Sequence, residues 1–130
     1  MTGKKVLVVD DEIHIVHVVA IKLRNNGYEV ISASNGAEAF ELACKNIPDI
    51  IVTDFQMPIM TGMELVEKLR ENEQTKDIPI IMLTARSFAI SKEQQEQLKI
   101  SDCLSKPFSP RELLGNIEDI LYQKKLTVNN

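Results

Sequence analysis

The sequence predicts an α/β domain in which five parallel strands form one sheet, covered by helices on both faces in a three-layer, doubly wound (βα)5 arrangement. Three observations predict this fold class. Short apolar, β-rich runs alternate with longer amphipathic segments along the whole chain. The first, third and fourth runs have no polar face, which is typical of strands buried on both sides. Parallel neighbours also need a crossover connection, and the amphipathic segments provide one each time.

The first two strand–helix units occupy the N-terminal part of the chain. The wholly apolar run VLVV predicts a strand over 6–9, and the helical spacing of the apolar residues that follow predicts a helix over 12–26. The β-rich run YEVISA predicts a strand over 28–33. A second helix is predicted over 36–46, because Asn35 is a favourable N-cap with a carboxylate three residues later.

The next two units repeat the same order. The run DIIVT predicts a buried strand over 49–53, and an amphipathic helix is predicted over 62–72. The run IPIIML predicts a second buried strand over 78–83. A helix over 88–98 is predicted from the amphipathic segment after it. These two central strands are expected to be fully enclosed by helices.

The last unit completes the fold. The short run DCLS predicts a strand over 102–105, and Ser109 is expected to cap a final helix over 110–125. Residues 126–130 are expected to form a polar, frayed C-terminal tail. Residues 1–125 are therefore predicted to form a single domain, without a linker or an internal repeat.

Composition limits the possible functions. The chain has 130 residues, of which 44% are hydrophobic and 26% charged, a mixture that suits one compact domain. A net charge of −4 argues against a nucleic-acid partner held by a basic face. No apolar run approaches the length of a membrane span or a signal peptide, so a cytoplasmic protein without membrane contact is expected. Cys44 and Cys103 are expected to be reduced thiols.

Chemically active side chains follow the predicted strands. Asp10 and Asp11 follow the first strand, Asp54 the third, Thr84 the fourth and Lys106 the fifth. Any one of them would ordinarily be a cap, a turn residue or a solvated charge, but in open α/β sheets ligands bind beyond the carboxyl ends of the strands. Oxygen ligands without His or Cys favour Mg²⁺ over Zn²⁺. The metal and the lysine together could hold an anion such as a phosphoryl group.

Four motifs give the chain a family resemblance. The stretches VLVVDDE, DIIVTDFQMPIMTGMELVEKLR, IPIIMLTA and LSKPFSPREL occur in this order and cover nearly the whole chain. In spacing and order they resemble the receiver domain of two-component response regulators, including the chemotaxis regulators. The resemblance implies a flavodoxin-like sheet with strand order 2-1-3-4-5. It also implies a stand-alone receiver that acts through protein contacts and is not itself classed as an enzyme.

The resemblance assigns the phosphoacceptor and the metal ligands. Asp54 is similar to the carboxylate that receives a phosphoryl group from a sensor histidine kinase or a histidine phosphotransfer protein. Asp10, Asp11, Asp54 and the backbone carbonyl of Gln56 are expected to bind Mg²⁺. Positioning and charge neutralisation are then enough for the chain to assist its own phosphorylation and dephosphorylation. The downstream protein target is unknown, and a monomer or weak dimer is expected.

The resemblance also assigns the phosphate ligands. Thr84 is expected to hydrogen-bond one phosphoryl oxygen and Lys106 to pair with another, with a cis peptide bond between Lys106 and Pro107. Gln56 and Arg86 are expected to shield the phosphoryl group from water. The chain departs from the family at Cys103, where an aromatic residue is usual. Coupling of the site to a partner surface is therefore not expected to use the usual aromatic switch.

Three other functions fit parts of the sequence. A phosphatase of the haloacid dehalogenase type would need an aspartate at the position of Gln56. A flavodoxin-like flavin or nucleotide binder would need a glycine-rich loop where Asp10 and Asp11 stand. A degenerate receiver could act as a scaffold only, although every acceptor position is intact. His14 and His17, one helical turn apart, are expected to be surface residues and not metal ligands.

The first predicted helix has two apolar stripes. One stripe is expected to face the core, and the second either widens the buried face or docks the helical bundle of a kinase. The core stripe comprises Ile15, Val18, Val19 and Leu23, and the second stripe comprises Ile13, Val16 and Ala20.

Overall fold

A computed structural model describes residues 3–85 and 90–128 and shows five parallel strands in one sheet. The strand order is β2-β1-β3-β4-β5, so both the predicted fold class and the predicted order are confirmed. The strands are β1 (Lys5–Val9), β2 (Glu29–Ala33), β3 (Ile50–Asp54), β4 (Ile80–Thr84) and β5 (Asp102–Ser105).

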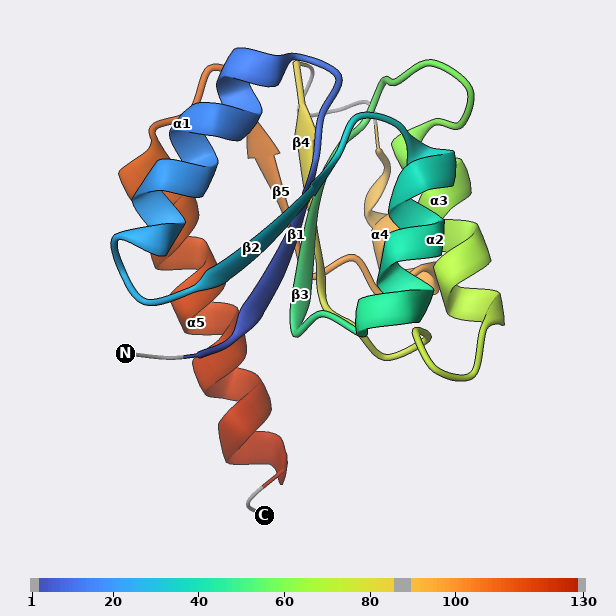
Figure 1. Ribbon diagram of the computed structural model, residues 1–130. Helices are drawn as coiled ribbons and strands as arrows, with labels where there is room; N and C mark the ends of the chain where they lie inside the picture. The colour runs from blue at the N-terminus through green and yellow to red at the C-terminus, as the bar shows by residue number, and fades with distance from the viewer. Residues whose placement is uncertain (1–2, 86–89, 129–130) are drawn as a thin grey trace.

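Helices cover both faces of the sheet, as Figure 1 shows. On one face lie α1 (Ile13–Arg24) and α5 (Pro110–Val128). On the other face lie α2 (Gly36–Asn46), α3 (Gly62–Glu71) and the short α4 (Lys92–Gln97). Each parallel strand therefore connects to the next by a helical crossover, as parallel pairing requires. In the described part of the chain, no helix is both long enough and apolar enough to span a bilayer.

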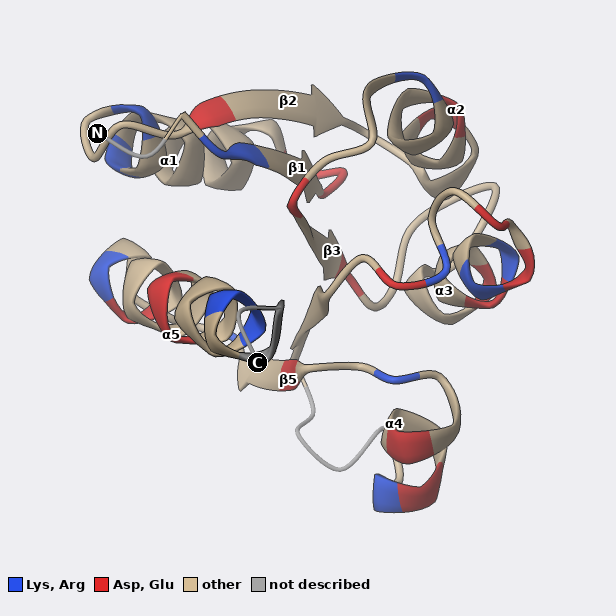
Figure 2. Cartoon of the chain, turned by 90° about the horizontal axis from the view of Figure 1, so that it is seen from below, with Lys and Arg blue, Asp and Glu red and all other residues tan. Residues whose placement is uncertain are grey.

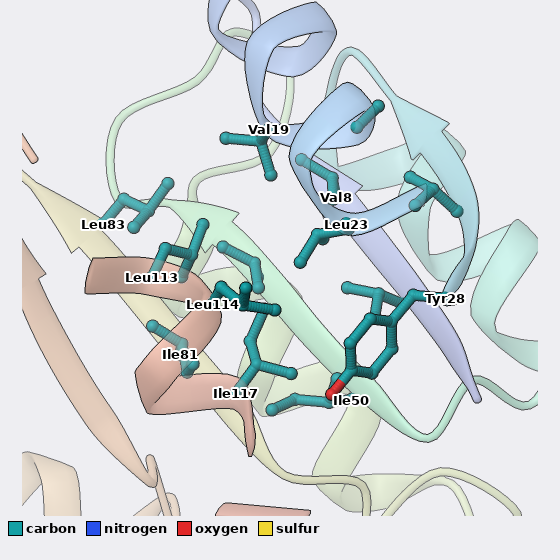
Figure 3. Packing of buried hydrophobic residues seen from close by; sticks show 14 of the residues in the cluster. Val8, Val19, Leu23, Tyr28, Ile50, Ile81, Leu83, Leu113, Leu114 and Ile117 are labelled. Atoms are coloured by element: carbon teal, nitrogen blue, oxygen red, sulfur yellow. The ribbon is translucent and has the colours of Figure 1, made fainter. Parts of the chain in front are cut away.

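The sheet separates two apolar cores. Every residue of β3 and β4 is buried, which confirms that the wholly apolar runs are central strands. On the face of α1 and α5, Leu23, Leu113 and Ile117 pack over the sheet in one cluster, seen from close by in Figure 3. On the other face, Leu65 and Leu69 of α3 belong to a second cluster. Burial of each such side chain contributes roughly 1.5–3 kcal/mol to folding, so the sheet edge that carries the chemistry rests on a rigid support.

Local capping fixes where the helices begin. The Asn35 side chain accepts a hydrogen bond from the Glu38 N–H at 2.9 Å, and the Ser109 hydroxyl accepts one from the Glu112 N–H at 3.0 Å. Both predicted N-caps are therefore confirmed. At the start of α3, Thr61 and Glu64 form a full capping box. The Thr61 hydroxyl accepts a hydrogen bond from the Glu64 N–H, and the Thr61 N–H donates one to the Glu64 carboxylate.

Some boundaries differ from those predicted. β3 and β4 each run one residue further, so Asp54 and Thr84 end their strands instead of following them. Helix 88–98 was predicted too long, because a capping box between Ser91 and Gln94 starts α4 at residue 92. Residues 86–89, where that helix was expected to begin, lie outside the described part of the chain. α5 continues to Val128, three residues beyond the predicted helix end at 125.

The predicted core stripe of α1 was wrong in part. Val19 and Leu23 are buried as expected, but the other buried positions are Val16 and Ala20 from the second stripe. Val18, assigned to the core, is 51% exposed. The buried side of α1 is the side that faces the sheet. Val18 lies outside this buried side and is turned towards solvent. Ile13 and Ile21 are also exposed, at 69% and 59%.

Candidate functional site

The predicted site residues meet at the carboxyl ends of the strands. Thr53 of β3 pairs with Val9 of β1, Asp54 pairs with Leu83 of β4, and Thr84 pairs with Ser105 of β5, so the strand ends are level. They form a cleft of about 550 Å³. The cleft is lined by Asp11, Glu12, Asp54, Phe55, Gln56, Thr84, Ala85 and Lys106.

Lys106 bridges two buried carboxylates. Its Nζ lies 3.0 Å from Asp10 Oδ2 and 3.1 Å from Asp54 Oδ1, and a third carboxylate oxygen, Glu12 Oε1, is 3.5 Å away. The backbone N–H of Lys106 also donates a hydrogen bond of 2.8 Å to the backbone carbonyl of Thr84. A cis peptide bond joins Lys106 to Pro107, as predicted. The ammonium group is therefore held by carboxylates at the ends of β1 and β3, while the backbone of Lys106 is tied to the end of β4.

Three carboxylates lie close enough to share a cation. One oxygen each of Asp10, Asp11 and Asp54 lies within 4.8 Å of the others. Asp10 is 1% exposed and Asp54 7%, whereas Asp11 is open to solvent. Asp10 is held in place because its Oδ1 accepts the Glu12 N–H at 3.0 Å. An all-oxygen set with one solvent-facing member suits Mg²⁺, which retains several water ligands.

The electrostatics of the cleft also favour a bound cation. Burial, together with the charge of nearby Asp10, raises the pKa of Asp54 above its ordinary value, although Lys106 opposes this shift. Burial works against the charged form of Lys106, but its contacts with Asp10 and Asp54 outweigh burial and raise its pKa. One lysine therefore stabilises the carboxylates only in part, and a divalent ion would complete the neutralisation.

A glycine lets the loop after β3 fold back onto the acceptor strand. The Gly62 N–H donates to the carbonyl of Phe55 at 2.9 Å. A Cβ at Gly62 would collide with the Asp54 carbonyl oxygen and come within 2.9 Å of Met82 Sδ. Only glycine permits this close approach, so α3 begins directly against the strand that carries Asp54.

Gly62→Ala is expected to destabilise the protein by about 1–3 kcal/mol, because the added methyl group must push the Asp54 backbone aside. The free energy of unfolding in urea measures this loss. Gly115→Ala in α5 is the matched control, since no atom lies within 4 Å of its added Cβ. A helical glycine replaced by alanine should gain about 0.5–1 kcal/mol. Equal effects at the two positions would contradict the crowding at Gly62.

The structure brings together the site residues predicted from the sequence. Thr84 is 3% exposed and lines the cleft, and Gln56 lines it from the loop after β3. Arg86, expected to shield the site, lies outside the described residues. Glu12 was missed as a site residue, although it continues the acidic run that begins at Asp10. His14 is a surface residue as predicted, 3.6 Å from Glu12.

The described residues include both cysteines of the chain. Cys44 and Cys103 are free and partly buried, in agreement with the prediction. Burial, with a smaller contribution from the charge of Asp102, raises the pKa of Cys103. A raised pKa keeps the group as a thiol at neutral pH, which disfavours nucleophilic chemistry. Cys103 packs against the core on the side of α3 and α4.

The chain is similar in sequence to proteins of one known family. A model of the response regulator receiver domain matches residues 6–118. The phosphate regulon transcriptional regulatory protein PhoB of Pseudomonas aeruginosa is 40% identical over 93% of this chain and 53% of its own length. The alkaline phosphatase synthesis transcriptional regulatory protein PhoP of Bacillus subtilis is 41% identical over 95% of this chain and 51% of its own. The chain thus spans about half the length of the curated relatives it matches.

Solved structures match over nearly their full length. The chemotaxis response regulator CheY4 of Vibrio cholerae superposes with a TM-score of 0.85 at 39% identity, covering 92% of this chain and 99% of that one. The receiver domain of the sensor histidine kinase PA1611 of Pseudomonas aeruginosa, solved with a magnesium ion in its active site cleft, gives a TM-score of 0.79 at 30% identity. That match covers 94% of this chain and 97% of the other.

Proposed function

The chain belongs to the response regulator receiver family, and from this we propose that Asp54 is its phosphoacceptor, with a phosphohistidine of a sensor histidine kinase or a histidine phosphotransfer protein as the donor. Receivers are phosphoacceptors and not enzymes in the ordinary sense. We propose in addition that this chain assists both the arrival and the loss of its phosphoryl group. A cytoplasmic location stays a prediction from the sequence.

One observation carries the assignment. Among the residues described, Asp54 is the carboxylate that combines a strand-end position in the cleft, contact with Lys106 at 3.1 Å and a place in the cluster with Asp10 and Asp11. Asp10 is still more deeply buried and does not line the cleft. Asp11 lines the cleft but makes no ion pair with Lys106 in the described structure. Glu12 lines the cleft and pairs with Lys106 at 3.5 Å, but it lies outside the cluster. Of the three clustered carboxylates, Asp54 alone both lines the cleft and pairs with Lys106.

The chemical step needs little beyond these groups. A carboxylate oxygen of Asp54 attacks phosphorus as the bond from phosphorus to the donor imidazole nitrogen breaks, and the electron pair of that bond stays on the nitrogen. The product is an acyl phosphate on Asp54. Lys106 is placed to pair with a phosphoryl oxygen, and the Thr84 hydroxyl is proposed to donate a hydrogen bond to another.

Asp10, Asp11, Asp54 and the backbone carbonyl of Gln56 are proposed to hold Mg²⁺, which when bound neutralises charge on the carboxylates and on the transferred group. The donor set supports this metal, because it offers oxygen atoms from both buried and solvent-facing positions. The magnesium ion reported in the PA1611 receiver domain agrees with the same choice.

Incubation of the purified chain with acetyl phosphate and Mg²⁺ tests the proposal. Intact mass spectrometry should show one added phosphoryl group, and hydroxylamine should remove it, because it cleaves acyl phosphates and spares phosphoesters. A chain that gains no mass under these conditions, or a label that resists hydroxylamine, would contradict the assignment. A panel of histidine kinases from the host would then identify the physiological donor by its rate of transfer.

The donor protein is proposed to dock beside the cleft on α1. An apolar hollow of about 430 Å³ lies between α1 and the segment after β5, with Ile15, Val18 and Phe108 among its lining residues. Glu12 and Lys106 line both this hollow and the cleft, so the two are adjacent. An amphipathic helix bearing the phosphohistidine could place its apolar face here and its imidazole over Asp54.

Val18→Glu is expected to slow transfer from a cognate kinase at least tenfold while sparing phosphorylation by acetyl phosphate, because it puts a charge into the docking hollow alone. Val18 is 51% exposed, so the fold should tolerate the change. Ile21→Glu is the matched control on the same helix, exposed at 59% and outside the hollow. Equal slowing by both donors would show damage to the fold, and equal slowing by both variants would remove α1 as the specific dock.

Gln56 is proposed to limit access of water to the phosphoryl group from the loop after β3. Gln56→Ala should accelerate loss of label from the purified phosphoprotein about threefold, equivalent to about 0.7 kcal/mol of barrier. The decay is followed in excess Mg²⁺, so that a change in metal affinity cannot imitate a change in water access. Decay at or below the rate of the unaltered chain would refute the shielding role.

A further inference from the structure

Four cationic side chains surround a small hollow at the end of the sheet opposite the cleft. This basal hollow encloses about 270 Å³, and Arg70, Lys76, Lys99, Ser101 and Lys124 contribute to its lining. Figure 2 looks onto this end of the molecule, where a blue segment marks the connection from α4 to β5. Because the whole chain carries a net charge of −4, a cluster of four cations is a local reversal of the overall balance.

Two of the four cations are matched by other groups. The Arg70 guanidinium donates hydrogen bonds to the carbonyls of Leu98 at 2.7 Å, Lys76 at 2.7 Å and Lys99 at 3.0 Å. Asp77, the acidic residue in the lining of the hollow, favours the charged guanidinium electrostatically. The Lys76 ammonium lies 3.0 Å from a carboxylate oxygen of Glu73. Arg70 therefore holds the rim of the hollow in shape and is not itself available to a ligand.

The other two cations are uncompensated. Within residues 3–85 and 90–128, neither the Lys99 nor the Lys124 side chain forms an ion pair or a hydrogen bond. The Lys99 backbone is nevertheless fixed, because it adopts a positive φ of 54° and its carbonyl is held by Arg70. Lys124 projects from α5, a separate element. Two lysines without an ion partner in the described structure thus line one hollow from independent parts of the chain.

We propose that the basal hollow binds a phosphate dianion, either inorganic phosphate or an organic phosphate monoester. The two unmatched charges of Lys99 and Lys124 equal the charge of the dianion, and lysine binds phosphate well as a point charge. The Ser101 hydroxyl lines the hollow and can donate to a phosphate oxygen. Pro79 and Ile120 add an apolar wall that an organic substituent could contact. This site is independent of the phosphoryl chemistry at Asp54.

The test is a titration of the ¹⁵N-labelled, metal-free chain at low ionic strength, followed by NMR. Inorganic phosphate and adenosine 5′-monophosphate are the two probes, and both should shift the amide signals of Lys99 and Ser101. Tighter binding of the nucleotide would identify an organic monoester as the preferred ligand, and equal binding would identify phosphate itself. Lowering the pH from 8 to 5 should weaken both, since the probes then lose one of their two charges.

The double variant Lys99→Gln, Lys124→Gln should weaken binding of both probes at least about tenfold. Both side chains are exposed, so their replacement should leave the fold unchanged. Lys92→Gln is the control for each single replacement, because it removes one positive charge from an exposed position at the other end of α4. The proposal is overturned if the double variant binds as the unaltered chain does, if Lys92→Gln weakens binding equally, or if the shifts are confined to amides of the cleft.

Discussion

Asp54→Asn is expected to abolish phosphorylation by acetyl phosphate and by any kinase donor, reducing incorporation by at least a thousandfold. The amide retains the size and shape of the side chain but cannot attack phosphorus as an anionic oxygen. Intact mass spectrometry after incubation with Mg²⁺ and acetyl phosphate measures the loss. Asp119→Asn, an exposed aspartate of α5, is the matched control and should be labelled as the unaltered chain is.

The same variant should also be more stable than the unaltered chain when metal is absent. The folded state raises the pKa of Asp54, so the ionised carboxylate at neutral pH disfavours folding, and that penalty shrinks as the pH falls. Asn removes the charge and with it the repulsion from Asp10, while Lys106 keeps its contact with Asp10 at 3.0 Å. An Asp54→Asn protein that unfolds at lower urea concentration than the unaltered chain would contradict this electrostatic account.

Asp11→Asn is expected to weaken Mg²⁺ binding at least tenfold, equivalent to about 1.4 kcal/mol. Asp11 is exposed and makes no ion pair in the described structure, so its loss should act on the metal and not on the fold. Isothermal titration calorimetry is the appropriate measurement, because the chain contains no tryptophan whose fluorescence could report the ion. Phosphorylation by acetyl phosphate should then require a correspondingly higher Mg²⁺ concentration.

Glu12→Gln distinguishes direct binding of Mg²⁺ by Asp11 from attraction of the ion by the overall negative charge of the cleft. Glu12 lines the same cleft and carries the same charge as Asp11, but it lies outside the group of three carboxylates close enough to share an ion. Its replacement should therefore change Mg²⁺ affinity much less, about two- to threefold. Equal losses in the two variants would mean that the cleft attracts the ion by its overall field and that Asp11 is not a ligand.

Most of the predicted fold followed from the apolar pattern of the chain. Val6 to Val9 and the runs before Asp54 and Thr84 have no polar face, and central parallel strands are the structures that bury both faces. The strand order could not be obtained this way, because alternation of strands and helices fits several orders. It came from the resemblance of the four motifs to receivers.

Details set by side-chain hydrogen bonds were harder to predict. The start of α4 depends on the reciprocal contact of Ser91 with Gln94, a weak local pattern that periodicity alone does not reveal. The burial of Val18 in α1 was predicted wrongly. Consecutive residues of a helix point 100° apart, so a small error in the orientation of the helix moves a side chain from the core to the surface. The positions of the candidate site residues were easier to predict, because the end of a strand fixes where a side chain lies and does not depend on the rotation of a helix.

α4 is the least firmly anchored element of the described fold. None of its residues from Lys92 to Gln97 is buried, and the apolar anchors Ile90 and Ile100 lie just outside its ends. Reorienting or unwinding this helix would expose almost no apolar surface, so its amides should exchange with solvent at a far lower opening free energy than those of the central strands.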